Sequence, residues 1–593
     1  MNNLRTHLFL LSFLIFLFTG CENYSRKDIY ERPEWLPGKL YTTILVNENL
    51  SMFAECLRLS GLDTIIDVSG SWCVFAPSDD AMKQYLAENH YSGISSIPAD
   101  ELERIAKFHI IQNPWSLEQL QSLSAFGWRT GSGTDDWYSH AYKRQTILKN
   151  SNEKYWIKGV NNKERIVTDS TITKSYKKVF VQSRKNAPVF YDDYVNINEI
   201  SSSDYSFYFD RNYEPGNVYF AGAKIIEADI LAENGFLHIV DRVVQPMLNA
   251  KEMLEREMPN ESYKLFLEMV YWYYPFFEPN MIATNNQSGV RYGEVVDTLW
   301  DLNYPYLVFA PHVEQIGVEG PAVNETFAIH KGLYAPTDKA FKKFIDNILT
   351  IKSGYPHWRD YKSLPRDITD IIIASHFKDE PVYPSKSSYK RIFKWNNGYK
   401  QDESAIIRSE FGSNCTFIGI DSYTPNRVFT SVTGPVFLRP NFSLFRQALL
   451  YCDIEDDISY KNEDLYFFPI SDQALKSDSS LIINWIDKEK NRYNFSEFNR
   501  KTEKIESLSK NKLKKRILNH VGTLVPNQSG NTIQIKTLDG KYITWDQTNN
   551  TIQGKYPCTI GYNGITVTTC TPVQLSEPAD NGETWSVNHW FNF

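Results

Sequence analysis

The stretch 71–86, SWCVFAPSDDAMKQYL, decides the fold, because two related stretches follow it along the chain. They are HKGLYAPTDKAFKKFI at 330–345 and EDLYFFPISDQALKSD at 463–478. Each has a short β-rich run, an aromatic residue, a proline, a Ser/Thr-Asp pair and an amphipathic helical pattern. This repetition predicts three similar α+β units, in which helices pack on mixed β-sheets.

The proline of each copy marks the end of a strand. Proline lacks the N–H that a sheet ladder needs, so we expect the central strands to end at Pro77, Pro336 and Pro469. The first N–H groups of the next helix need a side chain that accepts their hydrogen bonds. We expect that cap from Ser78, Thr337 and Ser471, or from the Asp beside each of them.

Each copy is followed by one histidine on an apolar pattern, at 102–111, 368–377 and 513–522. A single His on such a pattern is typical of a hydrogen-bonded core residue rather than a catalytic or metal-binding one. The first and third units end in an Asn-Gly turn and an alternating closing strand, at 233–246 and 580–591. For the second unit, we expect the closing strand near 428–438, which lacks that turn.

This ordered set of segments resembles the fasciclin domain. VFAPSDDAM and LYAPTDKAF are similar to the strand-to-helix block of that family, and NGFLHIVD at 234–241 is similar to its closing strand. Phe108-His109 and Asn519-His520-Val521 resemble its second block, and IQIKTLDGKYITW at 533–545 resembles its last hairpin.

The resemblance implies three tandem fasciclin-like domains at 38–248, 249–440 and 441–593. The first two domains are longer than is usual for the family, so we expect insertions near 125–215 and 280–328. Long inserted loops are typically functional or face a partner.

The N-terminus carries an export signal. Residues 8–18, LFLLSFLIFLF, are about half as long as the ~20 residues that span a bilayer, and Arg5 precedes them. The following LFTGC resembles the lipobox of bacterial lipoproteins, with Phe18 where Leu is usual. The resemblance implies that 1–20 is removed, that Cys21 is acylated and that 21–37 is a tether. An ordinary cleaved signal with a chance cysteine is the alternative.

Composition excludes several classes of protein. Of the 593 residues, 42% are hydrophobic and 23% are charged, as in folded proteins, and the length exceeds that of a single core. The formal charge of −8, with scattered Lys and Arg, disfavours a nucleic-acid partner. After the signal, no apolar run approaches the length of a membrane-spanning helix.

The cysteines suggest a disulfide rather than a metal site. None of them forms CxxC or a Cys/His zinc spacing, so we expect no metal. Cys558 and Cys570 flank TIGYNGITVTT, whose Asn563-Gly564 pair indicates a hairpin. Export permits a disulfide between them. Two buried thiols are the alternative.

Sequence motifs for catalysis are absent. No GxSxG, HExxH, P-loop or complete dinucleotide fingerprint occurs in the sequence. Neighbouring acids such as Asp79-Asp80 point apart on a strand or helix, so caps and turns explain them better than acid–base chemistry. We therefore predict no enzymatic activity and no cofactor.

Two aromatic segments are candidates for ligand or partner contact. The densest follows a helical pattern at 259–270 and comprises Tyr271, Trp272, Tyr273, Tyr274, Phe276 and Phe277. The other, at 127–142, contains Trp128, Trp137 and Tyr138. These rings either fill a core and the seam between units or form an exposed platform, because large exposed apolar patches mark interaction sites.

Together these patterns predict a non-catalytic binding or adhesion protein, lipid-anchored at the outer membrane and facing the cell exterior. Its lipobox, composition and inserted loops look like those of Bacteroidota surface lipoproteins, which implies an accessory role beside a SusC/SusD-like nutrient uptake complex. A direct glycan-binding protein is the first alternative, with a glycan or a peptide as ligand. A surface hydrolase with its site in the insertions is the second.

Overall fold

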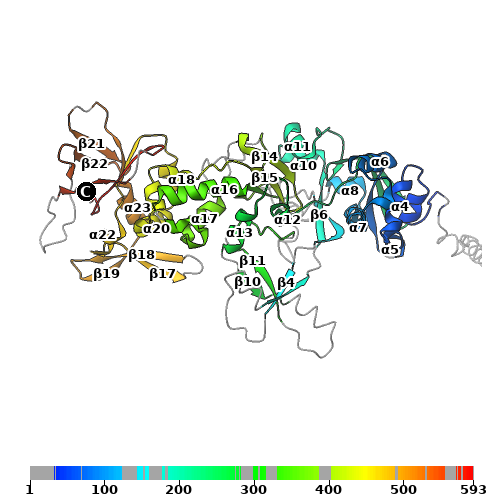
Figure 1. The fold of residues 1–593 in the computed structure, drawn as a ribbon, viewed down its shortest axis with the longest axis horizontal. Helices are drawn as coiled ribbons and strands as arrows, with labels where there is room; N and C mark the ends of the chain where they lie inside the picture. The colour runs from blue at the N-terminus through cyan, green and yellow to red at the C-terminus, as the bar shows by residue number, and fades with distance from the viewer. Residues whose placement is uncertain are drawn as a thin grey trace, which may run out of the picture.

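The computed structural model describes residues 33, 35–68, 70–122, 143–150, 154–158, 176–180, 184–273, 276–279, 281, 298–304, 307–314, 330–354, 356–385, 403–477, 479–487, 492–527, 530–553, 569–570, 572–575 and 579–591. Figure 1 shows an elongated α+β molecule, with the N-terminal unit at one end and the C-terminal unit at the other. The mixed fold class is therefore as predicted. The limits of the three domains stay predictions.

The first unit is built on a closed barrel with the strand order β1-β2-β3-β6-β7-β8-β9. Its strands are β1 (Trp72–Pro77), β2 (Ile110–Gln112), β3 (Lys143–Lys149), β6 (Arg184–Phe190), β7 (Tyr219–Phe220), β8 (Ala223–Ala232) and β9 (Gly235–Val240). Strands β3 and β6 lie within 125–215, the region expected to be an insertion, so part of that region belongs to the barrel.

The second and third units carry open sheets. The second has the order β13-β12-β15-β14, from β12 (Lys331–Pro336), β13 (Phe377–Lys378), β14 (Ile406–Phe411) and β15 (Cys415–Ile420). The third has the order β24-β23-β22-β21-β20-β16-β26-β25. Its strands are β16 (Leu465–Phe467), β20 (Val521–Leu524), β21 (Thr532–Thr537), β22 (Tyr542–Asp546), β23 (Thr551–Gln553), β24 (Thr569–Cys570), β25 (Val573–Gln574) and β26 (Gly582–Ser586). The meander β17 (Ile482–Asp487), β18 (Arg492–Asn499) and β19 (Lys504–Leu508) adds a separate sheet.

A parallel strand pair recurs at the centre of all three units. Strand β1 pairs with β9, β12 with β15, and β16 with β26, each in parallel. Pro77 and Pro336 are the last residues of β1 and β12, and Pro469 follows two residues after β16. The predicted strand ends are confirmed at Pro77 and Pro336, whereas β16 ends two residues before Pro469.

The hydroxyl residue after each proline caps the next helix, as expected. Helices α6 (Asp79–Glu88) and α16 (Asp338–Phe344) begin after Ser78 and Thr337, whose hydroxyls accept hydrogen bonds from Ala81 N and Ala340 N. Ser471 accepts the corresponding bond at α22 (Asp472–Ser477).

The Asp of each pair caps a different helix, the one that precedes the central strand. Asp79 accepts the N–H of Met52 at 2.8 Å, Asp338 that of Leu265 at 2.7 Å, and Asp472 that of Leu444 at 2.8 Å. These bonds lie at the starts of α4 (Ser51–Leu59), α13 (Lys264–Trp272) and α20 (Ser443–Cys452). Since an N-cap side chain satisfies orphan N–H groups, each Asp joins two helices that are distant in sequence.

The glycine of the Asn-Gly turn is required by close backbone approach. A Cβ on Gly235 would lie 1.9 Å from the carbonyl oxygen of Trp72, and one on Gly582 would lie 2.0 Å from that of Leu465. Both glycines also have positive φ, at 158° and 135°. Only glycine tolerates both conditions.

The expected closing strand of the second unit was wrong. Residues 428–438 form α18 (Arg427–Thr430) and α19 (Gly434–Leu438), and the closing strand is β15. Asn414 precedes β15 as Asn234 precedes β9, and each side-chain oxygen accepts the first N–H of a helix, Ala250 N and Leu40 N. Cys415 stands where the other units have glycine, so the turn signal is missing from the sequence.

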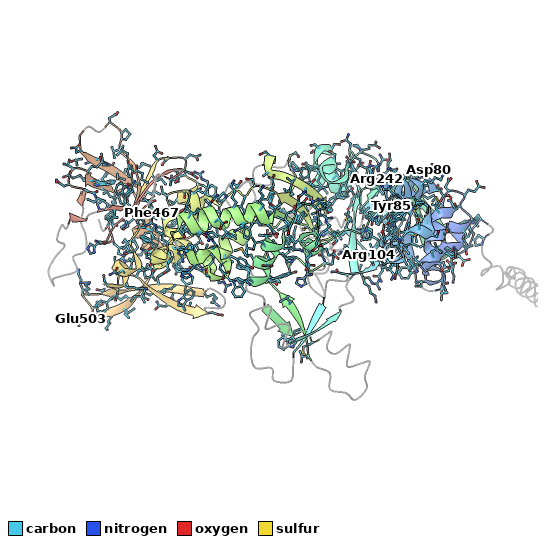
Figure 2. The ribbon with its side chains drawn as sticks, viewed as in Figure 1. Asp80, Tyr85, Arg104, Arg242, Phe467 and Glu503 are labelled. Carbon is cyan, nitrogen blue, oxygen red and sulfur yellow. The ribbon has the colours of Figure 1, made fainter. Side chains whose placement is uncertain are left out.

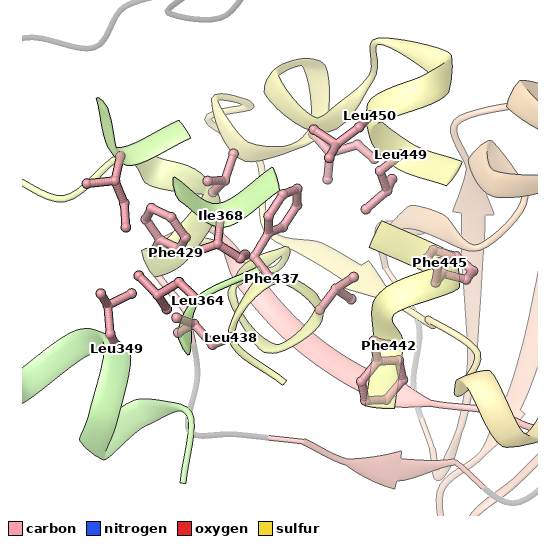
Figure 3. Packing of buried hydrophobic residues seen from close by; sticks show 14 of the residues in the cluster. Leu349, Leu364, Ile368, Phe429, Phe437, Leu438, Phe442, Phe445, Leu449 and Leu450 are labelled. Carbon is pink, nitrogen blue, oxygen red and sulfur yellow. The ribbon is translucent and has the colours of Figure 1, made fainter. Parts of the chain in front are cut away.

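The second and third units share one hydrophobic core. A single buried cluster includes Leu333 of the second sheet and Phe467 of the third. In Figure 3, Ile368 on α17 (Arg366–Ala374) lies among Phe429, Phe437 and Leu438, which lead towards Phe445 on α20. Because this buried core is continuous, we expect the two units to fold and unfold together rather than as independent domains.

Candidate functional site

The dense aromatic segment starts at the end of α13 and divides between two environments. Tyr273 is buried, and Tyr271 and Trp272 are half-buried and packed against the shared core. The Tyr271 ring centre lies 6.0 Å from that of Tyr304, and Lys362 Nζ lies 5.7 Å from the centre of the Trp272 ring. The first three rings therefore pack as core and seam residues rather than as a freely exposed platform.

The rest of the segment leaves the helix and enters a sheet. Phe276 and Phe277 lie on β10 (Phe276–Pro279), whereas Tyr274 falls outside the described residues. The start of α13 is capped by Asp338, because Leu265 N donates to its carboxylate.

Strand β10 belongs to a four-stranded sheet made from two units. Its order is β10-β11-β4-β5, with β4 (Lys154–Lys158) and β5 (Tyr176–Phe180) from the first unit and β11 (Leu299–Asn303) from the second. The two insertions meet at β11 and β4, where Leu299 pairs with Ile157 and Trp300 with Trp156. In Figure 1 this sheet projects from one side of the molecule, below its long body.

Several predicted site residues fall outside the described residues. They are Cys21, Trp128, Trp137, Tyr138 and Cys558. The backbone of Cys570 lies on β24, opposite Ile552, but its side chain is not among those that the structure describes. The disulfide and the second aromatic segment therefore stay predictions.

The described cysteines are free, buried thiols: Cys56, Cys73, Cys415 and Cys452. Burial raises the pKa of Cys56 and of Cys452 to about 12. A thiol so rarely ionised is a poor nucleophile, since the thiolate is the reactive form.

The three repeat histidines are core residues. His109 and His520 bond through Nδ1 to the carbonyls of Ile105 and Phe468, at 2.9 Å and 2.6 Å. Their Nε2 atoms accept the N–H groups of Val244 and Phe591, at 3.1 Å and 2.8 Å. Burial lowers the pKa of His109 to about 4 and that of His520 to about 3. Each ring is therefore neutral and binds the segment that follows the closing strand.

His376 occupies the same place in the second unit. Its Nδ1 bonds to the carbonyl of Tyr334 at 2.9 Å, and burial lowers its pKa to about 3. Within the described ranges, no group of three or more His, Cys, Asp or Glu side chains is placed to hold a metal ion.

A cleft of about 810 Å³ lies where the first unit meets the second. Its walls are α7 (Ala99–Phe108), the end of α11 (Ser202–Phe209), α12 (Ala250–Glu255) and the end of β14. Residues 242–248, which link the two units, also line it. Figure 2 labels Arg104 and Arg242, which the first unit contributes to the cleft.

The charges around the cleft are unevenly neutralised. Arg256 pairs with Glu410, which also pairs with Arg408 at 3.1 Å. Arg104 and Arg242 also line the cleft, and among the described side chains neither has an ion-pair partner. Sequence reasoning missed this cleft, because its walls come from segments separated by some three hundred positions.

Part of the first unit is similar to a known family. Residues 48–181 match the model of the fasciclin domain. The matched residues include β1 and its capped helix α6, together with α7 and His109, so the expectation from the first repeat is confirmed for this part of the chain.

One similar solved structure is a FAS1 domain pair from the insect cell adhesion molecule fasciclin I. The alignment covers 65% of this chain and 96% of that one, at 12% identity and with a TM-score of 0.18. Among curated proteins, no sequence matches the chain. No helix of the described residues is both long and apolar enough to cross a membrane.

Proposed function

We propose that this protein is a non-catalytic binding or adhesion protein of the cell surface, built from three tandem fasciclin-like domains. It is anchored in the outer membrane through the lipid on Cys21 and serves as an accessory subunit of a SusC/SusD-like nutrient uptake complex. The lipid only tethers the body. Specificity for the partner must therefore come from the protein surface.

The observation that carries this proposal is the projecting sheet. Strands β10 and β5 are its edges among the described strands. Exposed edges and projecting sheets are natural docking elements, because their unpaired N–H and C=O groups accept another strand. The sheet joins the two insertions through β11 and β4, and it projects from the long body. None of its described residues belongs to the buried core that the second and third units share.

A rigid body supports presentation of such a sheet. Between the first and second units, Lys185 Nζ lies 3.1 Å from Glu314 Oε1 and also pairs with Glu252, and Lys185 is 2% exposed. Phe411 of the second unit packs against Phe190 of the first, with ring centres 5.5 Å apart. Buried ionic and aromatic contacts of this kind fix one geometry between the units.

The three repeat histidines support a non-catalytic role. A general base must reach a substrate and have a pKa near the working pH. His109, His376 and His520 are instead fully buried, and each is bonded to the backbone.

The proposal is tested by native affinity isolation of the tagged full-length protein from the source membrane. We expect stoichiometric co-purification of an outer-membrane transporter or another surface lipoprotein. The double variant Trp156→Ala/Trp300→Ala, which alters the register pair joining the two insertions, should lose that partner.

The matched control is Trp485→Ala, which removes a 39%-exposed tryptophan from the sheet of the third unit. It should keep the partner. Co-purification that is equally strong in both variants would show that the projecting sheet is not the docking element. Saturable binding to a glycan array, with no co-purifying protein, would favour the glycan-binding alternative.

A further inference from the structure

The linker between the first two units lines the cleft and resembles an edge strand that has one side unpaired. Residues 243–248 form neither helix nor sheet. Pro246 holds the preceding Gln245 in an extended conformation, since a residue before proline avoids the helical region. An extended segment points alternate N–H groups to opposite sides.

The inner side of this linker is bonded to both units. Val244 N donates to His109 Nε2 at 3.1 Å, and the carbonyl of Leu248 accepts Ser413 N at 2.9 Å. Pro246 has no N–H group, and its position places it on the same inner side as Val244 and Leu248. The even-numbered positions therefore attach the linker to the body.

The odd-numbered positions are open. Among the described residues, the N–H groups of Val243, Gln245 and Met247 meet no acceptor, and their carbonyls meet no donor. These three residues line the cleft, and none of them is buried. An extended chain with one unpaired side is a template for pairing with another extended chain.

The residues that line the cleft indicate which side chains a bound peptide would have. Arg104 and Arg242 bring two guanidinium groups that no described carboxylate pairs, and guanidinium binds carboxylate in a bidentate fork. Phe209, Phe411 and Met247 provide an apolar surface beside them. Asp100, Glu101 and Asp210 also line the cleft without a described cationic partner, and Glu101 accepts hydrogen bonds from the hydroxyls of Tyr85 and Tyr91. A segment with acidic residues only would be repelled at those positions.

We propose that this cleft binds an extended peptide segment, which pairs with the backbone of residues 243–247 and places an acidic side chain between Arg104 and Arg242. The volume of about 810 Å³ is within the range of small-ligand sites. The site is separate from the projecting sheet, so it does not depend on the function proposed above.

The test uses the intact protein body from residue 22 onward, immobilised and exposed to a synthetic library of random acetylated octapeptides. Bound peptides are sequenced by mass spectrometry. We expect enrichment of peptides with one Asp or Glu flanked by extended-preferring residues. The double variant Arg104→Ala/Arg242→Ala should lose at least tenfold of that binding.

Two controls separate the cleft from general charge attraction. Arg58→Ala removes an exposed arginine of α4, outside the cleft, and should leave binding unchanged. The best peptide is then N-methylated at alternate positions, in two complementary sets. Only the set whose N–H groups face the linker should abolish binding, because methylation removes the donor.

Three outcomes overturn the proposal. The first is that the wild-type protein enriches no peptides over the double variant. The second is that both sets of N-methylated peptide bind equally well, and the third is that the enriched peptides are basic. Thermal unfolding of each variant establishes that it is folded, and a variant with altered unfolding is replaced by Arg104→Gln/Arg242→Gln, which keeps the polar side chains but removes their charge.

Discussion

Arg446 on α20 donates to the carboxylate of Asp367 on α17, and both side chains are only 2% exposed. Asp367 also accepts a hydrogen bond from Gln447 Nε2 at 2.8 Å. These residues come from the second and third units, so the ion pair lies inside the core that the two units share. The second and third units are therefore connected by a buried ion pair and not only by a flexible linker. We call this Arg446–Asp367 pair the lock.

Removing one partner of this pair should be costly. Arg446→Ala leaves the Asp367 carboxylate buried without its cation, which typically lowers the free energy of unfolding by about 3–5 kcal/mol. Chemical denaturation measures this loss, and we expect the second and third units to unfold together. Lys83→Ala breaks the exposed Lys83–Asp80 pair and should change stability little. A similar effect of both changes would contradict the lock.

The carboxylate of Asp79 should matter far more than that of its neighbour Asp80. Asp79→Ala removes the acceptor of Met52 N and of the Ser51 hydroxyl, at the start of α4. Loss of a helix cap costs about 1–2 kcal/mol. Asp80 is almost fully exposed, so Asp80→Ala is the matched control for a thermal melt. Equal melting temperatures for the two variants would refute the capping role.

The buried histidines should make the protein sensitive to acid. In the unfolded chain a His has a pKa of about 6.5, whereas burial lowers the pKa of His520 to about 3. The unfolded state therefore binds more protons below pH 6.5, and stability falls as the pH drops from there towards 3.

This loss is about 2 kcal/mol for each such histidine between pH 7 and pH 5. Denaturation at both pH values measures it, and His520→Gln should reduce the difference. His90 is exposed, so His90→Gln should leave the difference unchanged. An equal pH dependence in wild type and His520→Gln would refute the assignment.

Glu455 should destabilise the fold in mildly alkaline solution. Burial, with the nearby charges of Asp456 and Asp453, raises its pKa to about 8. The unfolded chain ionises near pH 4.5, so stability is present below that pH and is lost as the pH rises through 8. Glu455→Gln should therefore be more stable than wild type at pH 8, by about 1–3 kcal/mol. The exposed Glu463→Gln control should show no gain.

Cys21→Ala should abolish membrane anchoring and leave the domains folded. The physical reason is that, in the proposed lipoprotein, a lipid on this cysteine supplies the apolar surface that enters the bilayer. Detergent phase separation measures the partition of the protein, and circular dichroism establishes folding. A variant that still enters the detergent phase, after partners are removed with high salt, would contradict the lipoprotein prediction.

Much of each unit could be predicted because its signals are local. A proline that ends a strand and a hydroxyl that caps the next helix act within a few residues, so Pro77-Ser78 and Pro336-Thr337 could be read directly. The histidines were equally readable as core residues, from one polar residue on an apolar pattern.

The closing strand of the second unit could not be found by its turn, although Asn414 and Asp421 hold the places of Asn234 and Asp241. The aromatic segment was harder still. Its periodicity did not reveal that Tyr273 enters the core while Phe276 and Phe277 enter a strand.

The sequence by itself determined the three strand–proline–helix segments and the order of the elements around them, because these depend on neighbouring residues. Only the tertiary structure decided which helix each Asp caps, which strand closes the second unit, and that β4 pairs with β11 across more than a hundred positions. The cleft at residues 242–248 joins segments that lie far apart in the sequence, and strand pairing is made by backbone groups. Since every residue carries the same backbone, such contacts leave little trace in the order of the side chains.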